Sequence, residues 1–433
     1  MTITYDPAHA AYPDEADVRG ELTRVFDVCD GCRRCVTLCS AFPSLFEMIG
    51  GAGGEAGALT PAQQDRVADE CFQCRLCRAN CPYVPGQHEL AIDFPRLMAR
   101  TIAMRHSTGQ RTIKAIVADQ LLGRTDFVGK VATRAAPVIN RVVGIEPHTV
   151  RRRVLAQLSG VTARRRLTPF VRRRFSSSIK RPRTADDPNA ERRVTLFPTC
   201  LVEYRRPQIG VALVDVYAHN HIACDVARVG CCGAPWLTAG DTRRFAAVAS
   251  RNVAALAAAI RAGTDVVVAQ STCHAVITTD YLDHVGGGDA ELVAGRTFDA
   301  LQYLADHLID HTADQTGDQP GDHGGTTRIV HHEPCPGLVE ESPSPARRLL
   351  EMTGATVEEV RRCTGVDARW GLRAANERIA LANARQLGAE IERSAGELVS
   401  GSCVLTNSSI AEQTGREVIH PFEHLASSYG HNG

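Results

Sequence analysis

Two groups of cysteines near the amino end constrain this chain more than any other feature. Four cysteines lie within eleven residues in CFQCRLCRANCP (71–82), and CDGCRRCVTLCS (29–40) repeats the same offsets of 0, 3, 6 and 10. Thiols this close together are too crowded for ordinary core packing and would brace only a short loop, so they indicate ligands. The eight residues are Cys29, Cys32, Cys35, Cys39, Cys71, Cys74, Cys77 and Cys81.

The spacing predicts two iron–sulfur clusters. C-x2-C-x2-C-x3-C-P is the ligand pattern of bacterial ferredoxins with two 4Fe-4S clusters, in which the fourth cysteine of each run binds the other cluster. Three thiolates on one short loop reach three irons of a cubane, and the remaining iron faces a different backbone segment. We therefore assign one cluster to Cys29, Cys32, Cys35 and Cys81, and the other to Cys71, Cys74, Cys77 and Cys39.

Other uses of these cysteines fit the pattern less well. The first motif departs from it in one place, since Ser40 stands where proline follows Cys81, and Pro43 comes later. Structural zinc is an alternative, but zinc is usually held by two separated C-x2-C pairs. Disulfides are a weaker alternative, because the amino end lacks a secretory pattern and cytosolic thiols stay reduced.

The overall composition is that of a globular protein with several domains. The 433 residues suggest about three domains, and 44% of them are hydrophobic. The longest apolar run, VAALAAAI (253–260), is far shorter than the ~20 residues that cross a bilayer. We expect a cytoplasmic protein without a transmembrane helix.

A basic stretch follows the cysteine motifs. Residues 96–183 hold 21 Lys and Arg against three acidic residues, a net charge of +18 that the rest of the neutral chain balances. Apolar residues recur there at helical spacing, for example at Val128, Val131, Val138 and Val142, which predicts amphipathic helices with arginine-rich polar faces. Such helices could contact an anionic membrane surface, cover an acidic partner, or form a solvated linker packed on their own protein.

The arginine run and the aromatic residues of this stretch bear on its partners. Arg151, Arg152 and Arg153 are the cations that we expect to contact an anionic surface. Only phenylalanines 127, 170 and 175 could stack on bases, and no nucleic-acid-binding motif is present, so we expect no nucleic-acid partner.

From Arg192 onward, predicted strands and helices alternate twice in the same order. Strands are expected at VTLFP, DVVVAQ, RIVHHEP and ELVSG, with helices between them, which favours two parallel βαβ units. The predicted fold class is α+β and multidomain, with a helical two-cluster ferredoxin domain followed by a duplicated α/β domain. The expected parts are 1–95 (ferredoxin-like), 96–191 (basic helices and linker), 192–310 (first repeat), 311–327 (linker) and 328–433 (second, degenerate repeat).

The two repeats carry their own cysteines. The first has Cys200, the run Cys231-Cys232-Gly233, and Cys273. Together with the amino-terminal motifs, this pattern resembles the CCG-motif iron–sulfur oxidoreductase subunits. That family includes the catalytic subunit of heterodisulfide reductase, the iron–sulfur subunit of glycolate oxidase, and the C subunit of anaerobic glycerol-3-phosphate dehydrogenase. The resemblance covers nearly the whole chain and is greatest for the last of these.

The resemblance implies a metal site in the first repeat. The family pattern has five cysteines in each repeat, and in heterodisulfide reductase such a repeat holds a non-cubane cluster. Cys200, Cys231, Cys232 and Cys273 would supply four thiolates to one further iron–sulfur cluster. The alternative is that they are reduced thiols that pack as small hydrophobic side chains.

The second repeat is degenerate. It keeps Cys335, Cys363 and Cys403, whereas Thr364 and Ser400 stand where the family has cysteines. Whether this repeat holds metal stays open. Three histidines near the cysteines could replace the missing ligands or could make ordinary polar contacts, and they are His274, His331 and His332.

The resemblance also implies a function. It predicts an electron-transfer subunit of a flavin-dependent dehydrogenase, of the glycerol-3-phosphate or 2-hydroxy-acid type, at the inner face of the cell membrane. Electrons would come from a FAD-containing dehydrogenase subunit and pass toward quinone or another acceptor. The chain has no G-x-G-x-x-G after a strand and no P-loop, which fits a flavin carried by a partner. The alternatives are a heterodisulfide-reductase-like enzyme that reduces a disulfide or thiol-linked substrate, and a zinc-stabilised interaction protein.

Overall fold

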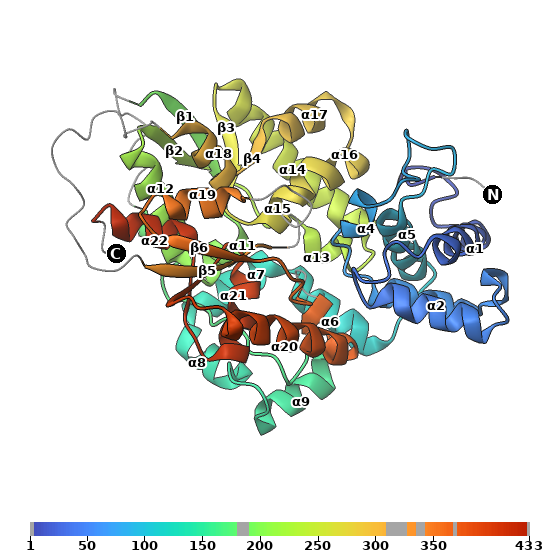
Figure 1. Ribbon diagram of the computed structural model, residues 1–433. Coiled ribbons are helices and arrows are strands. Elements are labelled where there is room, and N and C mark those ends of the chain that lie inside the picture. Colours follow the sequence, from blue (N-terminus) through green and yellow to red (C-terminus); the bar gives the residue numbers. More distant parts are fainter. Residues whose placement is uncertain (1–3, 180–189, 309–326, 335–342, 367–369, 431–433) are drawn as a thin grey trace.

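The computed structural model describes residues 4–179, 190–308, 327–334, 343–366 and 370–430. A helical amino-terminal part lies beside a larger body that contains two sheets, with a further group of helices along the lower side of the view (Figure 1). The α+β fold class predicted from the sequence is confirmed. The linker expected at 311–327 falls outside the described residues except for Thr327.

Five helices form the amino-terminal part and surround both cysteine motifs. Side chains cap three of them: Asp14 accepts from the Asp17 amide, Asp93 accepts from the Arg96 amide, and Thr60 forms a capping box with Gln63. The helices are α1 (Glu15–Cys32), α2 (Ala41–Gly51), α3 (Pro61–Glu70), α4 (Leu76–Ala79) and α5 (Phe94–Ser107), with a 3-10 turn η1 (Ala56–Ala58).

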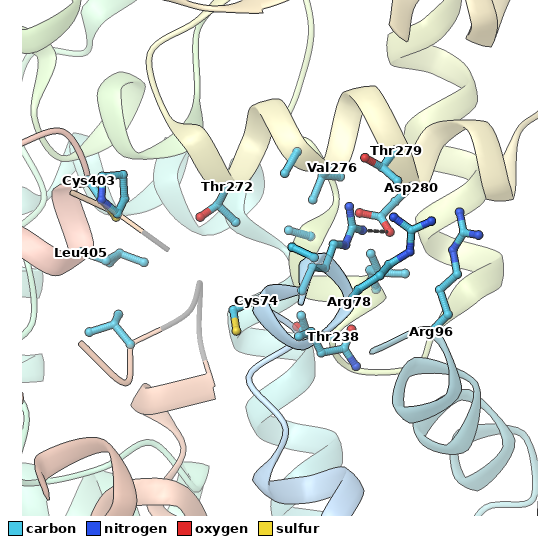
Figure 2. Close-up of a pocket in the computed structure, with 18 of the residues that line it drawn as sticks. Cys74, Arg78, Arg96, Thr238, Thr272, Val276, Thr279, Asp280, Cys403 and Leu405 are labelled. Carbon is cyan, nitrogen blue, oxygen red and sulfur yellow. Dashed lines mark hydrogen bonds and ion pairs between the residues drawn. The ribbon is translucent and has the colours of Figure 1, made fainter. Parts of the chain in front are cut away.

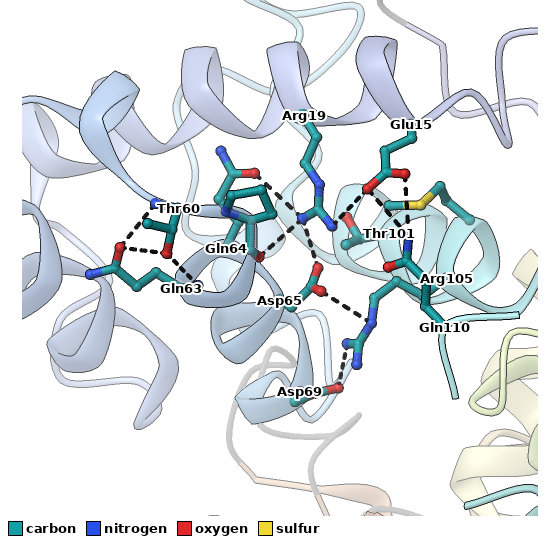
Figure 3. A network of polar contacts seen from close by, with 12 residues as sticks. Glu15, Arg19, Thr60, Gln63, Gln64, Asp65, Asp69, Thr101, Arg105 and Gln110 are labelled. Atoms are coloured by element: carbon teal, nitrogen blue, oxygen red, sulfur yellow. Dashed lines mark hydrogen bonds and ion pairs between the residues drawn. The ribbon is translucent and has the colours of Figure 1, made fainter. Parts of the chain in front are cut away.

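Ion pairs join three of these helices on the outside of the apolar core (Figure 3). Arg19 of α1 contacts Asp65 of α3 at 2.7 Å, and Arg105 of α5 contacts Asp69 of α3 at 2.8 Å. Gln110, just after α5, reaches back to Glu15 at 3.3 Å. Because these contacts link the first, third and fifth helices, they fix the frame that carries the motifs.

The basic stretch folds as a layer of helices against the body. These are α6 (Ile113–Gly123), α7 (Thr125–Arg134), α8 (Ala136–Val143), α9 (Val150–Ser159) and the short α10 (Phe175–Ser178).

Helices α6 and α7 pack on the body through glycines, which differs from the usual arrangement. A Cβ at Gly123 would lie 2.5 Å from the Trp236 ring, and one at Gly129 would lie 2.5 Å from the Tyr204 ring. None of the four valines whose spacing predicts these helices is buried. Eleven of the fourteen exposed large hydrophobic side chains among the described residues lie here instead. We call them the outer apolar face: Ile113, Ile116, Val117, Leu121, Phe127, Val131, Val138, Val142, Val150, Val154 and Leu158.

The first α/β unit has a four-stranded parallel sheet in the order β2-β1-β3-β4. Its strands are β1 (Arg192–Phe197), β2 (Ile222–Val226), β3 (Asp265–Val268) and β4 (Thr297–Asp299). The helices are α11 (Cys200–Tyr204), α12 (Pro207–His219), α13 (Ala234–Leu237), α14 (Thr242–Arg261), α15 (Ser271–Ala275), a π-helix η2 (Val276–Asp280), α16 (Tyr281–His284), α17 (Gly287–Gly295) and α18 (Ala300–His307).

The second unit repeats this topology, with a parallel sheet in the order β6-β5-β7-β8. The strands are β5 (Arg328–His332), β6 (Thr356–Val360), β7 (Leu398–Gly401) and β8 (Val418–Ile419). The helices are α19 (Pro345–Glu351), η5 (Trp370–Leu372), η6 (Ala374–Asn376), α20 (Glu377–Arg393), α21 (Val404–Thr414) and α22 (Pro421–Ser428).

The two units share one hydrophobic core. Helix α12 of the first packs on α22 of the second, and the rings of Tyr217 and Phe422 meet edge to face at 6.0 Å. Val404 at the start of α21 belongs to the same core, and its amide reaches the side chain of Gln270 after β3. Because the carboxyl ends of parallel strands carry the ligands of open α/β sheets, this packing brings Cys403 of the second repeat toward the cysteines of the first.

Candidate functional site

The two amino-terminal motifs share an unusual left-handed backbone conformation at the same position. Arg33 follows Cys32 with φ of 52°, and Arg75 follows Cys74 with φ of 64°. Left-handed backbone is uncommon for residues with a Cβ and requires support from the surrounding structure. Its presence at the same place in both motifs shows that the repeated spacing corresponds to a repeated loop.

The eight motif cysteines gather in two groups. Burial raises the pKa of Cys29 to about 12, and the thiols that raise it further are Cys35, Cys81 and Cys32. Burial likewise raises the pKa of Cys77 far above its ordinary value, and the thiols that raise it further are, in decreasing order, Cys71, Cys74, Cys39 and Cys35. The three largest thiol contributors are, for both Cys29 and Cys77, two cysteines of the same motif and one of the other.

Backbone amides point at several of these sulfurs. The amide of Gln73 lies 3.4 Å from the Cys71 sulfur, and the amide of Tyr83 lies 3.4 Å from the Cys81 sulfur. Amides in the first turn of α2 donate to Cys39, because the helix begins directly after Ser40. This start explains why the first motif tolerates serine there, with Pro43 inside the first turn, where its nitrogen needs no helical partner. Amide donors stabilise the negative charge of a thiolate.

The two groups differ in exposure. Cys32 is exposed and lies in a shallow surface pocket of about 30 Å³, whereas Cys71 is buried. Cys74 faces the larger body, where its thiol interacts with that of Cys363. The first group is therefore open to solvent, and the second is turned toward the repeats.

Aromatic packing holds the second group against the second repeat. Phe72 and Trp370 meet edge to face with ring centroids 4.3 Å apart, and the Trp370 indole donates to the Asp69 carbonyl at 2.7 Å. Two ion pairs attach the same region to the first repeat: Arg75 to Asp280 at 2.5 Å and Arg96 to Asp283 at 2.6 Å.

The first repeat brings its four cysteines together. Cys200 begins α11, Cys231 and Cys232 follow β2, and Cys273 lies in α15 after β3. The sulfurs of Cys231 and Cys200 are 3.9 Å apart, and those of Cys232 and Cys273 are 3.4 Å apart. Hydrogen bonds from the Cys200 and Cys232 thiols lower the pKa of Cys231.

Polar side chains hold the loop that carries Cys231 and Cys232. Asp126 of α7 accepts from the Cys231 amide at 2.8 Å, and Tyr281 donates to the Cys232 carbonyl at 3.0 Å. Asn252 donates to the Cys231 carbonyl at 3.0 Å. Sequence reasoning missed all three roles, and the only signal was that Asp126 is one of three acidic residues in the basic stretch.

The second repeat places its cysteines differently. Cys403 is the N-cap residue of α21 and faces the first repeat, whereas Cys363 packs near Cys39 and Cys74. Cys335 lies outside the described residues. The hydroxyl of Ser400, where the family has a cysteine, lies 3.2 Å from the His331 ring.

The three histidines considered as substitute ligands have other partners. Besides Ser400, His331 contacts Glu333 at 3.5 Å. The His332 ring lies 2.8 Å from the Arg362 carbonyl, and burial lowers its pKa to about 4. The His274 ring lies 3.3 Å from the Thr297 carbonyl. His331 and His332 are buried and His274 is partly buried, and each has at least one polar partner in the protein.

Two cavities border the repeat cysteines. One of about 330 Å³ lies between the ferredoxin-like part and the repeats, with Cys74 on one side and Cys403 on another (Figure 2). A second, of about 160 Å³, lies between α6, α7 and the four cysteines of the first repeat. Cys403 lines both cavities.

The donor set fits iron–sulfur clusters. Burial raises the pKa of Cys29 and Cys35 to about 12 and about 11, so these thiols ionise readily only beside a positive charge such as that of iron. Sulfur donors with amide hydrogen bonds are the usual surroundings of such clusters. Among the described residues, no three His, Cys, Asp or Glu side chains already converge on a position for a single metal ion.

Comparison with known protein families defines the class of this chain. Residues 22–108 match the Fer4-like domain of citrate utilization protein B, and residues 194–278 match the cysteine-rich CCG domain. The chain therefore joins a Fer4-like domain to a CCG domain, and the CCG match covers the first repeat.

Individual relatives agree with this class. The chain is 24% identical over 417 residues to the C subunit of anaerobic glycerol-3-phosphate dehydrogenase from Escherichia coli (strain K12), a similarity that spans 84% of this chain and 99% of the relative. The same protein from Escherichia coli O157:H7 gives the same values. Citrate utilization protein B of Escherichia coli is 35% identical over 79 residues, which is 18% of each chain.

In the part of the chain that the structure describes, no helix has the length and apolar character needed to cross a membrane.

Proposed function

We propose that this chain is an iron–sulfur electron-transfer subunit of a flavin-dependent dehydrogenase, with two 4Fe-4S clusters in its amino-terminal part. One cluster is held by Cys29, Cys32, Cys35 and Cys81, and the other by Cys71, Cys74, Cys77 and Cys39. The observation that supports this most is the surroundings of Cys29, whose thiol neighbours are Cys35 and Cys32 of its own motif and Cys81 of the other. The clusters, when bound, carry one electron each.

The exposure of the two groups suggests a direction of transfer. The first group opens to solvent at Cys32, where a partner protein can approach. The second faces the cavity that also borders Cys403. We infer that electrons enter at the first cluster and leave through the second toward the repeats.

The similarity to the C subunit of a glycerol-3-phosphate dehydrogenase supports a dehydrogenase subunit as the electron donor. We propose that this partner carries FAD, because the chain itself shows no dinucleotide-binding motif. The substrate is glycerol 3-phosphate or a 2-hydroxy acid, and the electrons pass to quinone at the inner face of the cell membrane.

A third cluster in the first repeat is part of the proposal. Cys231, Cys232 and Cys273 are buried, and together with Cys200 they supply four sulfurs from three loops. The side chains of Asp126, Asn252 and Tyr281 hold the CCG backbone in position. This site lies beside the cavity of about 160 Å³, so it is placed to deliver electrons to a small molecule there.

Anaerobic purification tests the proposal. The protein should be brown, absorb broadly near ~400 nm, bleach with dithionite, and contain about eight irons for the amino-terminal clusters. Cys81→Ser should alter the signal of the first cluster and Cys39→Ser that of the second, in electron paramagnetic resonance spectra of the reduced protein. Cys224→Ala is the matched control, because Cys224 is buried in the core of the first sheet, outside every motif. An iron-free protein, or Cys81→Ser without effect on the first cluster, would contradict the proposal.

A further inference from the structure

The outer apolar face has the form of a surface that enters lipid. On each helix its residues recur at intervals of three or four, as at Val150, Val154 and Leu158 of α9, so they form a stripe along one side. Helix α6 packs on α9, and each of α7 and α8 packs on its neighbours, which keeps the stripes on one region of the molecule. Figure 1 shows α8 and α9 at the outer edge of the structure.

The exposed charged side chains of α6–α9 are all cations, and the exposed Glu146 between α8 and α9 pairs with Arg166 at 2.9 Å. Exposed cations flank the stripes, among them Lys130, Arg134, Arg141, Arg151 and Arg153. The acidic side chains of α6–α9 are turned away from solvent, since Asp119 is buried between arginines and Asp126 faces the CCG loop. An apolar stripe bordered by Lys and Arg is the pattern of helices that lie in the interface of a membrane.

The membrane contact that the structure indicates differs from the one that the sequence suggested. Arg152 was expected to face an anionic surface together with Arg151 and Arg153, but it is buried and donates to the Thr162 carbonyl. The arginine run therefore does not face outward as a whole, whereas the eleven residues of the outer apolar face do.

The cavity behind α6 and α7 opens on the same face. Leu121 belongs to the outer apolar face, with 47% of its surface exposed, and it also lines this cavity of about 160 Å³. Leu122 and Val128 form the wall inside it, and the four cysteines of the first repeat form the floor. A molecule dissolved in lipid could therefore reach the cysteines without crossing water.

One polar group in the cavity lacks a partner. Arg165 is 3% exposed and binds Ser409 and Glu412, but its Nη1 atom has no hydrogen-bond acceptor among the described residues. A buried donor without an acceptor is costly, and a carbonyl oxygen on a ligand would satisfy it. The cavity thus offers apolar walls and a charged donor, which suits a flat apolar ring that bears a carbonyl group.

We propose that this cavity binds the ring of a lipid-soluble quinone, which enters from a bilayer into which the outer apolar face inserts. The inference rests on the proposed function, because it names the site at which electrons would leave the chain.

Vesicle flotation with the full, anaerobically purified protein tests the insertion. Binding to vesicles of neutral phosphatidylcholine should persist in about 0.5 M salt, because apolar insertion is not screened. Val131→Asp combined with Val138→Asp should weaken partitioning about tenfold or more. Met352→Asp is the matched control, since Met352 is 58% exposed but lies outside the face. Binding that requires anionic lipid, or that the double variant leaves unchanged, would overturn the insertion.

Equilibrium dialysis of 2-methyl-1,4-naphthoquinone tests the cavity. Val128→Trp and the milder Leu122→Phe fill it and should weaken binding about tenfold, whereas Val150→Trp, on the exposed face of α9, should not. Arg165→Lys should weaken binding as well. Equal binding by all four variants would overturn the site. Dithionite should bleach the amino-terminal clusters normally in every variant. If dithionite does not bleach the unmodified protein, that result would contradict the proposed function and not the cavity.

Discussion

Phe72 of the second cysteine motif and Trp370 of the second repeat meet edge to face, with ring centroids 4.3 Å apart. Parts of the chain that are far apart in sequence are joined here, between the predicted second cluster and the repeats. The contact fixes how the ferredoxin-like part sits on the body.

Trp370→Ala should loosen this joint. The loss of a buried aromatic side chain is expected to reduce the free energy of unfolding by about 3 kcal/mol, and Asp69 loses its indole donor. Urea unfolding followed by circular dichroism measures the change. Trp370→Phe keeps the packing but not the hydrogen bond, so its free energy of unfolding should fall by less than half as much. Equal losses in the two variants would mean that the hydrogen bond, and not the ring, holds the joint.

The close packing of α7 on the first repeat depends on Gly129. A Cβ there would lie 2.5 Å from the Tyr204 ring, so Gly129→Ala should destabilise the protein by about 1–3 kcal/mol. Gly288→Ala in α17 is the matched control, because nothing lies within 4 Å of its Cβ position. The control should be neutral or stabilising by up to about 1 kcal/mol. Thermal unfolding of both variants checks the difference, and similar melting temperatures would contradict the packing.

Acid should destabilise the second repeat through His420. Its ring lies 3.2 Å from the Ser402 carbonyl and accepts from the Phe422 amide at 3.2 Å, so the neutral form uses both nitrogens. Burial lowers the pKa of His420 to about 3, compared with about 6.5 in an unfolded chain.

The folded-state pKa is lowered, so the stability contributed by neutral His420 is complete above about pH 6.5 and is lost as the pH falls toward 3. The loss should be about 1.4 kcal/mol for each pH unit in that window. Urea unfolding at pH 7 and pH 5.5 should show a smaller difference for His420→Asn, which keeps a helix-capping side chain, than for the unmodified protein. The exposed His9→Asn is the control. Parallel pH curves for His420→Asn and the unmodified chain would exclude this residue as the cause.

Cys232→Ser should remove the third cluster and leave the other two. Iron analysis should give more than about eight irons per chain for the unmodified protein and about eight for the variant. The electron paramagnetic resonance signals of the amino-terminal clusters should stay the same. If both proteins contain about eight irons, the first repeat holds reduced thiols, which is the alternative that the sequence leaves open.

Much of the fold follows from local pattern. Helices α12, α14, α19 and α20 and strands β1, β3, β5 and β7 lie where apolar periodicity predicted them. The remaining strands, β2, β4, β6 and β8, were not predicted. Strands β4 and β8 have three and two residues, too few positions for an alternating pattern. Strands β2 and β6 are as long as β5, and pairing with a neighbouring strand defines them.

The orientation of the basic helices could not be predicted in the same way. The spacing of Val128, Val131 and Val138 predicts an apolar stripe but does not say whether that stripe faces core or solvent. In α6 and α7, the side of the helix that carries the glycine packs instead against the rings of Trp236 and Tyr204.

The position of Cys363 was also beyond the sequence. The repeat pattern does not say which cysteines lie beside Cys363, and docking of the ferredoxin-like part places it beside Cys74. A residue whose neighbours come from another part of the chain cannot be located from local spacing.

The core shared by α12 and α22 has a consequence for how this chain can change over time. The second repeat has Thr364 where the first has Cys232, yet Phe422 and Val404 fill the interior of the first. A gene shortened after α18 would leave that interior open to water, and the product would be prone to aggregate. Selection can therefore erode the chemistry of the carboxyl-terminal half while retaining it as a scaffold for its twin.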